Sequence, residues 1–349
     1  TLAIARQTGN RIDEARAIRG LGTDRALTDS LKEALRLHDQ AYELARQVGD
    51  PVRGASMLAA GAEDLMRLGN LHEAWRRLAQ GLEMKRRGHD KIGTAEMLSL
   101  LARLQHRLGD PAAAEKLSRE QLALANQIGS PSLTATALRD LGRCRLAAGD
   151  LAGARRHLAA AVRSHADHGE ALAAAAARLE LADFFRLAGE PAEASRLAAQ
   201  VADWYGERGM NGHRARALAL LSQALLDQGR IAEAWRTAGQ AHAISESSED
   251  LELQLAVVTA MAPAGVAAGR GAEALGHLRW AVAEAGRIGD VAAALEARLA
   301  LGALQLKTGD AIAGSATLES VRRDAQARGF QGVARRAAAL LVGQTVTLG

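Results

Sequence analysis

Glycine recurs in this sequence at an interval of 20 residues, and that interval constrains the fold more than any other feature. One series falls 40 residues apart, at Gly69, Gly109, Gly149, Gly189, Gly229, Gly269 and Gly309. A second series lies half a period away, at Gly9, Gly49, Gly129, Gly169, Gly209, Gly289 and Gly329. Three slots of the same register hold other residues: Asp29, His89 and Glu249. Because glycine adopts the left-handed backbone conformation that follows a helix end, the pattern predicts a helix ending every 20 residues.

Residues that can cap a helix follow most of these positions. They are Asn10, Ser30, Asp50, Asn70, Asp90, Asp110, Ser130, Asp150, Asp250, Asp290 and Asp310. Their side-chain oxygens can accept hydrogen bonds from the free N–H groups of the next helix. Ser30 with Glu33, and Asn70 with Glu73, also have the spacing of capping boxes. Each 40-residue unit is therefore predicted to hold two antiparallel helices of roughly 17 residues, joined by very short turns.

Small residues recur in fixed columns of the same period. One column consists of Ala34, Ala74, Ala114, Ala154, Ala194, Ala234, Ala274 and Gly314. Small side chains at such positions allow two helix backbones to approach closely. A single helix pair cannot bury its apolar face alone, so the units must stack on one another. The sequence predicts an all-α solenoid of about eight helix pairs.

Composition narrows the class of protein further. Aromatic residues make up only 3% of the chain, so Ala and Leu must fill the core. The 44 basic and 40 acidic residues are mixed along the whole sequence, which is typical of a solvated surface rather than a nucleic-acid footprint. A single cysteine excludes an internal disulfide and favours a reducing compartment, so we expect a cytoplasmic protein. No apolar stretch is long enough to predict a membrane span.

The pattern resembles the tetratricopeptide repeat (TPR). Helix A of that family carries a Leu-Gly pair with a large residue three positions before the Leu, and Leu138, Leu141 and Gly142 match it. Helix B carries an Ala twelve residues after that Gly, and Ala154 and Leu158 match this position and the next one of the family. The resemblance covers the whole chain and implies a right-handed superhelix. The unit departs from the family in its length, 40 residues rather than about 34, and in having aliphatic residues at most of the aromatic positions.

The long, Ala- and Leu-rich unit is similar to the sensor arms of bacterial signalling proteins of the LuxR and maltose-regulator type. That resemblance implies a scaffold that binds a protein or a peptide. It further implies the sensor or docking region of a larger signalling or transcription-regulatory protein.

The resemblance also implies that the helix A face lines a concave groove where ligands bind. Carrying those positions over gives seven candidate contacts: Arg103, His106, Arg107, Arg139, Arg143, Asp183 and Arg186. Arginines four residues apart share one face of a helix, and guanidinium groups suit carboxylates, so an acidic partner is favoured. The alternative interpretation is that these arginines only solvate a helix surface.

The sequence also bears on catalysis and on metal binding. The sequence contains no G-x-x-x-x-G-K-[ST] loop and no G-x-S-x-G elbow, so no catalytic residue and no cofactor is predicted. His157, His165 and His168 could ligate a metal, but they precede the Gly169 turn, and we interpret them as a polar helix end. We interpret Cys144 as a buried small hydrophobe rather than a nucleophile.

Two further functions stay open as alternatives. Two groups of basic residues would suit a nucleic-acid-binding solenoid: Arg76, Arg77, Lys85, Arg86 and Arg87 on one helix, and the pair Arg155 and Arg156. Interleaved acidic residues and the lack of an aromatic stacking platform disfavour nucleic acid. The second alternative is self-assembly through the repeat ends, and the oligomeric state is left open.

The register also predicts domain boundaries. Residues 1–9 align with residues 41–49, so the chain is expected to begin inside a repeat and to belong to a longer protein. We predict the tail of a truncated repeat helix at 1–9 and eight TPR-like helix pairs at 10–329. A C-terminal capping helix at 330–342 and a tail at 343–349 complete the division.

Overall fold

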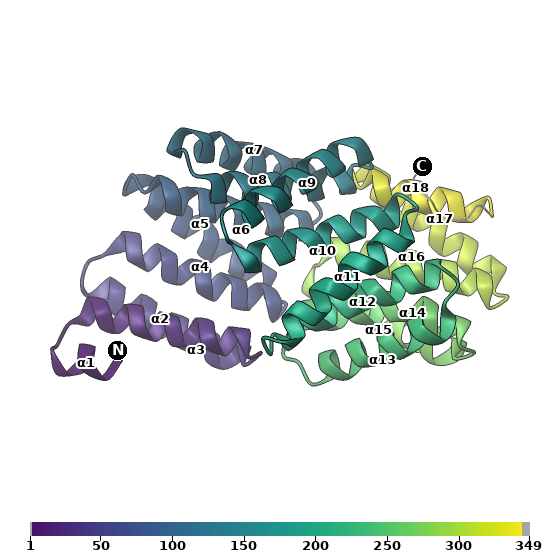
Figure 1. Ribbon diagram of the computed structural model, residues 1–349, viewed down its shortest axis with the longest axis horizontal. Coiled ribbons are helices and arrows are strands. Elements are labelled where there is room, and N and C mark those ends of the chain that lie inside the picture. The colour runs from purple at the N-terminus through teal and green to yellow at the C-terminus, as the bar shows by residue number, and fades with distance from the viewer. Residues whose placement is uncertain (1, 344–349) are drawn as a thin grey trace.

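Residues 2–343 are described by a computed structural model, and within this range the chain forms only helices joined by short turns (Figure 1). The helices are α1 (Leu2–Gln7), α2 (Arg11–Leu27), α3 (Leu31–Gln47), α4 (Pro51–Arg67), α5 (Leu71–Arg87), α6 (Lys91–Arg107), α7 (Pro111–Ile128), α8 (Pro131–Ala147), α9 (Leu151–Asp167), α10 (Ala171–Leu187), α11 (Pro191–Gly206), α12 (Asn211–Asp227), α13 (Ile231–Glu246), α14 (Leu251–Ala267), α15 (Gly271–Ile288), α16 (Val291–Lys307), α17 (Ala311–Ala327) and α18 (Gln331–Leu341). Consecutive helices pack as antiparallel pairs, which confirms the predicted all-α solenoid. Of the predicted tail, 343–349, all but Gly343 lies outside the described residues. None of the helices between residues 2 and 343 has the length and apolarity that crossing a bilayer requires.

The predicted helix ends depend on left-handed residues, and the structure places them as expected. Every glycine of the two series has a positive φ, and the substitutes Asp29 and His89 adopt φ values of 67° and 53°. Glu249 does not adopt this conformation, and the turn before α14 differs from the others. There α13 ends at Glu246, and the Ser248 hydroxyl accepts a hydrogen bond from the backbone N–H of Asp250 at 2.9 Å.

Side-chain caps form at all the predicted positions except Ser30 and Asn70. The two predicted capping boxes were therefore wrong. At Ser30 the reason is visible, because the backbone N–H of Lys32 donates instead to a carboxylate oxygen of Glu249 at 2.9 Å. A residue 217 positions away thus supplies the bond to the first turn of α3. Nothing in the structure explains the missing cap at Asn70.

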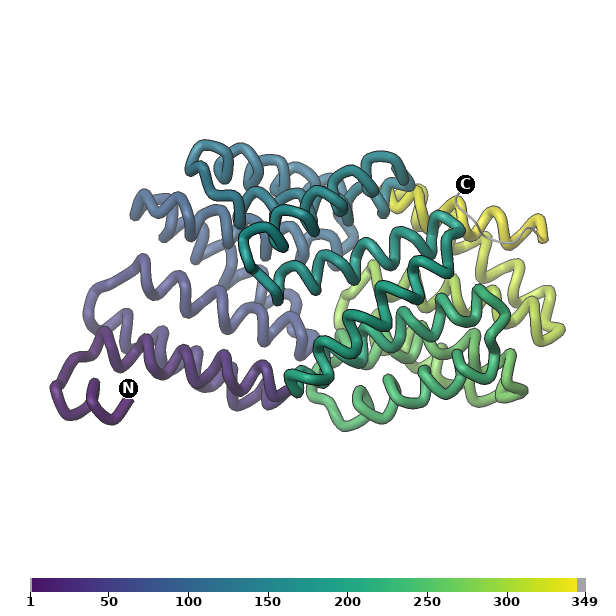
Figure 2. Tube along the Cα trace, in the orientation of Figure 1, coloured from purple at the N-terminus to yellow at the C-terminus, as the bar shows by residue number. Residues whose placement is uncertain are grey.

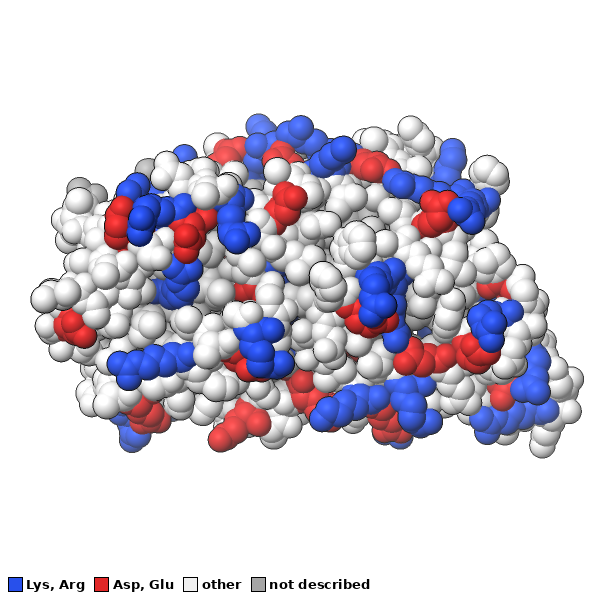
Figure 3. Space-filling view, turned by 180° about the vertical axis from the view of Figure 1, so that it is seen from behind, with Lys and Arg blue, Asp and Glu red and all other residues white. Residues whose placement is uncertain are grey.

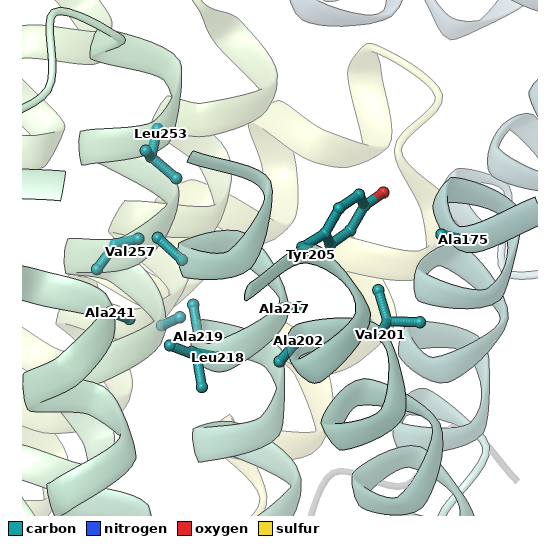
Figure 4. Packing of buried hydrophobic residues seen from close by; sticks show 12 residues of the cluster. Ala175, Val201, Ala202, Tyr205, Ala217, Leu218, Ala219, Ala241, Leu253 and Val257 are labelled. Carbon is teal, nitrogen blue, oxygen red and sulfur yellow. The ribbon is translucent and has the colours of Figure 1, made fainter. Parts of the chain in front are cut away.

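The core runs along the solenoid as a chain of small clusters. In one of them, buried side chains from the five consecutive helices α10 to α14 pack together, as Figure 4 shows. The Gly of the Leu-Gly pair lies at a close approach of two helices: a Cβ added to Gly142 would stand 2.6 Å from the Leu158 side chain of the next helix. Neighbouring units therefore interlock continuously, and no unit has a core of its own.

The superhelix closes on itself after five helix pairs. Helix α4 contacts α14, α6 contacts α16 and α8 contacts α18, each ten helices later in the chain. Figures 1 and 2 show the purple N-terminal helices meeting the green helices of the second half, and the yellow C-terminal helices beside the blue ones. Successive superhelical turns are thus in direct contact, a feature that the repeat pattern did not predict.

Two arginines in the same repeat position fasten one superhelical turn to the next. Arg67 Nε donates to Asp250 at 2.8 Å, and its Nη1 donates to the carbonyl oxygen of Ala26 at 2.8 Å. Forty residues on, Arg107 Nε donates to Asp290 at 2.7 Å, and its Nη1 donates to the carbonyl oxygen of Met66 at 2.8 Å. We call these two sets of bonds the arginine ties. Each tie joins the end of one helix A, the end of the preceding helix A and the N-cap of a helix A on the next turn.

The tie at Arg107 is buried and carries a second carboxylate. The Arg107 Nη1 also donates to Glu252 at 2.7 Å, and the side chains of Arg107 and Asp290 are only 9% and 3% exposed. Burial raises the pKa of Asp290, because a carboxylate deep in the protein is poorly solvated. Burial acts in the same direction on Glu252, but Arg216 and Arg107 outweigh it and hold the pKa of Glu252 well below its usual range.

Replacing Arg107 with Met keeps the aliphatic volume but leaves Asp290, a buried carboxylate, without its guanidinium, while Glu252 keeps its bond to Arg216. We expect Arg107→Met to lower the free energy of unfolding by about 3–5 kcal/mol, the usual cost of breaking a buried ion pair from one side. Chemical denaturation monitored by circular dichroism measures this loss. Arg87→Met is the matched control, since Arg87 is 78% exposed and pairs only within its own helix. Equal stability of the two variants would contradict a role for the tie.

His106 contacts the opposite turn of the superhelix and provides a pH-dependent test of closure. Its ring lies 5.2 Å from that of Phe330, edge to face. Burial, with Arg143 and Arg107 nearby, lowers the pKa of His106 from 6.5 to about 4. Because the folded state disfavours the protonated ring, this contribution to stability is present above pH 6.5 and is lost as the pH falls toward 4.

We therefore expect wild-type stability to fall between about pH 7 and about pH 5, with His106 accounting for about 2 kcal/mol of the loss. His106→Leu should reduce the dependence of Tm on pH over this interval, while His213, whose pKa burial also lowers to about 4, accounts for part of the remainder. His72→Leu, at an exposed position of α5, should leave it unchanged. Parallel pH profiles for His106→Leu and the wild type would show that the ring is not held neutral by closure.

Candidate functional site

The closed superhelix encloses a string of cavities lined mainly by the even-numbered helices. The largest cavity has a volume of about 1020 Å³ and is bordered chiefly by α4, α6, α8 and α10. A second of about 410 Å³ shares the Arg103, Arg139 and Tyr205 side chains with it. A third of about 480 Å³ shares Glu180 and Glu252 with the second. Because neighbouring cavities have walls in common, they follow one another along the inside of the solenoid.

The structure brings together three of the sequence-predicted contacts. Arg103, Arg139 and Arg143 all line the second cavity. Each faces a carboxylate: Arg103 pairs with Glu63 at 3.1 Å, and Arg139 approaches Asp140 at 3.4 Å. Arg143 lies 3.7 Å from a Glu180 oxygen.

The other four predicted contacts lie elsewhere along the string. Asp183 and Arg186 line the third cavity and pair with each other at 3.1 Å, and Arg186 also lies 3.9 Å from Asp227. His106 lines a smaller cavity of about 170 Å³ beside Phe330. Arg107 borders the third cavity, but its guanidinium is engaged in the tie described above.

The cavity walls mix apolar and charged side chains, and the charges are balanced. Arg216 of α12 donates to Glu252 at 2.9 Å and lies 3.7 Å from Asp250. His213 nearby is neutral at ordinary pH, because burial and the adjacent Arg216 lower its pKa to about 4. The interior therefore offers many hydrogen-bonding groups without a strong field of either sign.

Several wall residues were missed because they belong to helix B. Lys85 and Tyr205 line the largest cavity from the ends of α5 and α11, and Gln121 lines it from α7. The Lys85 ammonium donates to the Ser56 hydroxyl at 2.7 Å and to Asp90 at 2.8 Å. The sequence contains a pattern that could have identified two of these residues. Lys85 and Tyr205 stand in a column that is otherwise mostly alanine: Ala5, Ala45, Ala125, Ala285 and Ala325.

The residues considered for metal binding and nucleophilic chemistry have other surroundings. His165 is buried, and its Nδ1 lies 2.5 Å from a carboxylate oxygen of Glu170. No group of three or more His, Cys, Asp or Glu side chains suited to a metal occurs among residues 2–343. Cys144 is buried, as predicted, and burial raises the pKa of its thiol to about 11, which leaves it in the unreactive protonated form.

Comparison with known proteins gives a structural likeness only. No family model and no curated protein matches the sequence. Among solved structures, a Rap protein complexed with Competence and Sporulation Factor has a TM-score of 0.63 at 10% identity, covering 95% of this chain and 97% of its own. The apo form of the quorum sensor NprR from B. thuringiensis has a TM-score of 0.51 at 12% identity, covering 97% of this chain and 99% of its own.

A third structure is the signal transduction ATPase with numerous domains from Pyrococcus horikoshii, whose sensor consists of tetratricopeptide repeats. It has a TM-score of 0.47 at 17% identity and matches 79% of this chain. The chain spans 42% of the length of that protein. Identities this low establish the fold alone. By structure, the chain is a TPR-like repeat protein, an all-α solenoid of tandem antiparallel helix pairs.

Proposed function

We propose that this chain is a peptide-binding scaffold, the sensor or docking region of a larger bacterial signalling or transcription-regulatory protein that works in the cytoplasm. The observation that carries the proposal is the string of connected cavities inside the closed superhelix. Such an interior suits a ligand that is long, narrow and rich in hydrogen-bonding groups. A short stretch of polypeptide meets all three requirements.

The size of the largest cavity supports a ligand larger than a metabolite. Its volume of about 1020 Å³ lies at the upper end of the range of roughly 300–1000 Å³ that small-molecule sites span. The wall alternates apolar patches, such as Ala59, Leu100 and Ala176, with hydroxyl and charged groups. Alternation of this kind fits a chain of amides with side chains of mixed polarity.

The pairing of the arginines changes the expected chemistry of the partner. The sequence favoured an acidic ligand, but Arg103, Arg143 and Arg186 already have carboxylates beside them in the cavity walls. A strongly acidic peptide would have to compete with those partners. We therefore propose a peptide of mixed polarity, and binding that responds only moderately to salt.

The alternative of nucleic-acid binding receives less support. Each basic residue of the α5 run has a carboxylate neighbour: Arg76 and Arg77 pair with Glu73, Lys85 with Asp90, Arg86 with Glu120 and Arg87 with Glu83. Figure 3 shows basic and acidic side chains lying next to one another over the face opposite that of Figure 1. A phosphate backbone would need a surface with unpaired cations.

Two of the solved structures support the proposal by analogy. They cover nearly the whole chain, and one contains a Rap protein complexed with Competence and Sporulation Factor, while the other is a quorum sensor. The analogy concerns the fold, which by itself does not fix a ligand.

Affinity selection from a degenerate pool of short peptides tests the proposal. We expect the wild-type chain to retain a subset of mixed-polarity peptides, identified by mass spectrometry. Ala176→Trp places a large ring in the wall that the largest cavity shares with the second one, and it should weaken the capture at least tenfold by excluding the ligand.

The matched control is Ala112→Trp, which adds the same ring on the exposed side of α7. This variant should bind as the wild type does. Failure of the wild type to retain any peptide would overturn the proposal. Equal capture by wild type and Ala176→Trp would show that the peptide binds outside the interior cavities.

A further inference from the structure

Gln121 is a buried amide that finds no partner within the described part of the chain. It lies in the middle of α7, and its side chain is completely buried. Among residues 2–343, no group forms a hydrogen bond with either its Nε2 or its Oε1. The same side chain lines the largest cavity. A buried primary amide without hydrogen bonds is costly, so its presence calls for a physical reason.

The equivalent helix B positions of the other repeat units show that Gln121 is unusual. Seven other units place a small or apolar residue in the same position of helix B: Ala41, Gly81, Ala161, Val201, Ala241, Ala281 and Val321. All seven are buried like Gln121. The position therefore belongs to the core in every unit, and only one unit fills it with a polar group.

Packing explains the size of Gln121 but not its polarity. A Cβ added at Gly81 would lie 2.7 Å from the Met97 side chain, so that unit combines a small residue with a large one. In the Gln121 unit the residue in the place of Met97 is Ala137, which leaves room for a longer side chain. Val201, opposite Ala217, shows that an apolar residue fills such a space. The amide group is thus not required for packing.

A second unpartnered donor borders the same cavity. Arg139 comes from α8, and its Nε is buried and forms no hydrogen bond with any described residue. Both residues thus border the cavity with unpaired groups, an acceptor and donors that neighbouring side chains cover, so a ligand reaches them only after these side chains rotate. In an extended polypeptide, the N–H and C=O of one residue point to the same side, as they do when strands exchange pairs of hydrogen bonds. A glutamine amide can accept from that N–H and donate to that C=O at once.

We propose that Gln121 recognises the backbone of an extended peptide in the largest cavity, pairing with the N–H and C=O of one ligand residue. Arg139 Nε donates to a neighbouring carbonyl of the same ligand. This assignment rests on the proposed peptide-binding function and names the atoms that would form hydrogen bonds with the peptide. Because backbone groups are common to all peptides, Gln121 contributes affinity, and the side-chain surroundings determine which sequence is preferred.

The first test distinguishes the effect of the amide's hydrogen-bonding groups from the effect of side-chain volume. Gln121→Met keeps the length of the side chain and removes both hydrogen-bonding atoms, and Gln121→Glu keeps an acceptor but loses the donor. Without ligand, the Met variant should unfold at the same or a higher temperature than the wild type, since it no longer buries an unpaired amide. Its affinity for peptides captured from the degenerate pool should fall about tenfold or more.

Ser118→Ala is the control from the same helix. Ser118 is also completely buried, but its hydroxyl donates to the Ala114 carbonyl at 2.9 Å, and it does not border the cavity. Peptide affinity of this variant should equal that of the wild type. A lower unfolding temperature of unliganded Gln121→Met would show that the amide is satisfied within the fold, which overturns the inference.

The second test identifies the backbone as the partner. A captured peptide is resynthesised with one backbone N-methyl group at each position in turn. One position should weaken binding to the wild type about tenfold and have no such effect on Gln121→Met, since the variant has already lost the bond. Wild-type capture with equal affinity in Gln121→Met overturns this inference and leaves the proposed function standing. Absence of any wild-type capture overturns both.

Discussion

The arginine ties are the interaction on which the closed shape depends. A solenoid of helix pairs has strong contacts between neighbouring units but needs something further to fix the distance between its turns. Arg67 and Arg107 supply it, each bonded to a helix N-cap 183 residues away. Because the buried carboxylates cannot easily lose their partners, the closed arrangement is favoured over an open one.

Closure narrows a concave groove into a partly enclosed interior. In an open solenoid the helix A side chains would face solvent, and charged ones would contribute little. Inside the closed superhelix they lie in a restricted space, so oppositely charged residues such as Arg143 and Glu180 lie side by side in the wall of a cavity. The resulting walls are nearly neutral and rich in donors and acceptors. Such walls suit a ligand that resembles the protein backbone more than one carrying a strong charge.

The local parts of this fold could be predicted from the sequence, while its closure could not. Left-handed glycines and N-cap aspartates act within a few residues, so helix ends were predictable. Closure results from the small rotation of each helix pair relative to the one before it, added up over five pairs. No local sequence pattern predicts this total rotation. For this reason Arg107 was predicted only as a groove residue, and the Lys32–Glu249 contact that replaces the Ser30 cap was missed. Gln121 was visible as the polar exception in an apolar column, but only its burial shows that the amide is unpaired.

Zero-length carbodiimide cross-linking tests closure most directly. The Lys32 ammonium lies 3.4 Å from a Glu249 carboxylate, 217 residues away, and both groups are accessible to the reagent. Coupling in dilute solution should give a monomeric product in which mass spectrometry finds the peptide of Lys32 joined to that of Glu249. The product should disappear when the protein is unfolded before coupling. A folded chain that yields no such cross-link would contradict the closed superhelix, and with it the enclosed binding cavity.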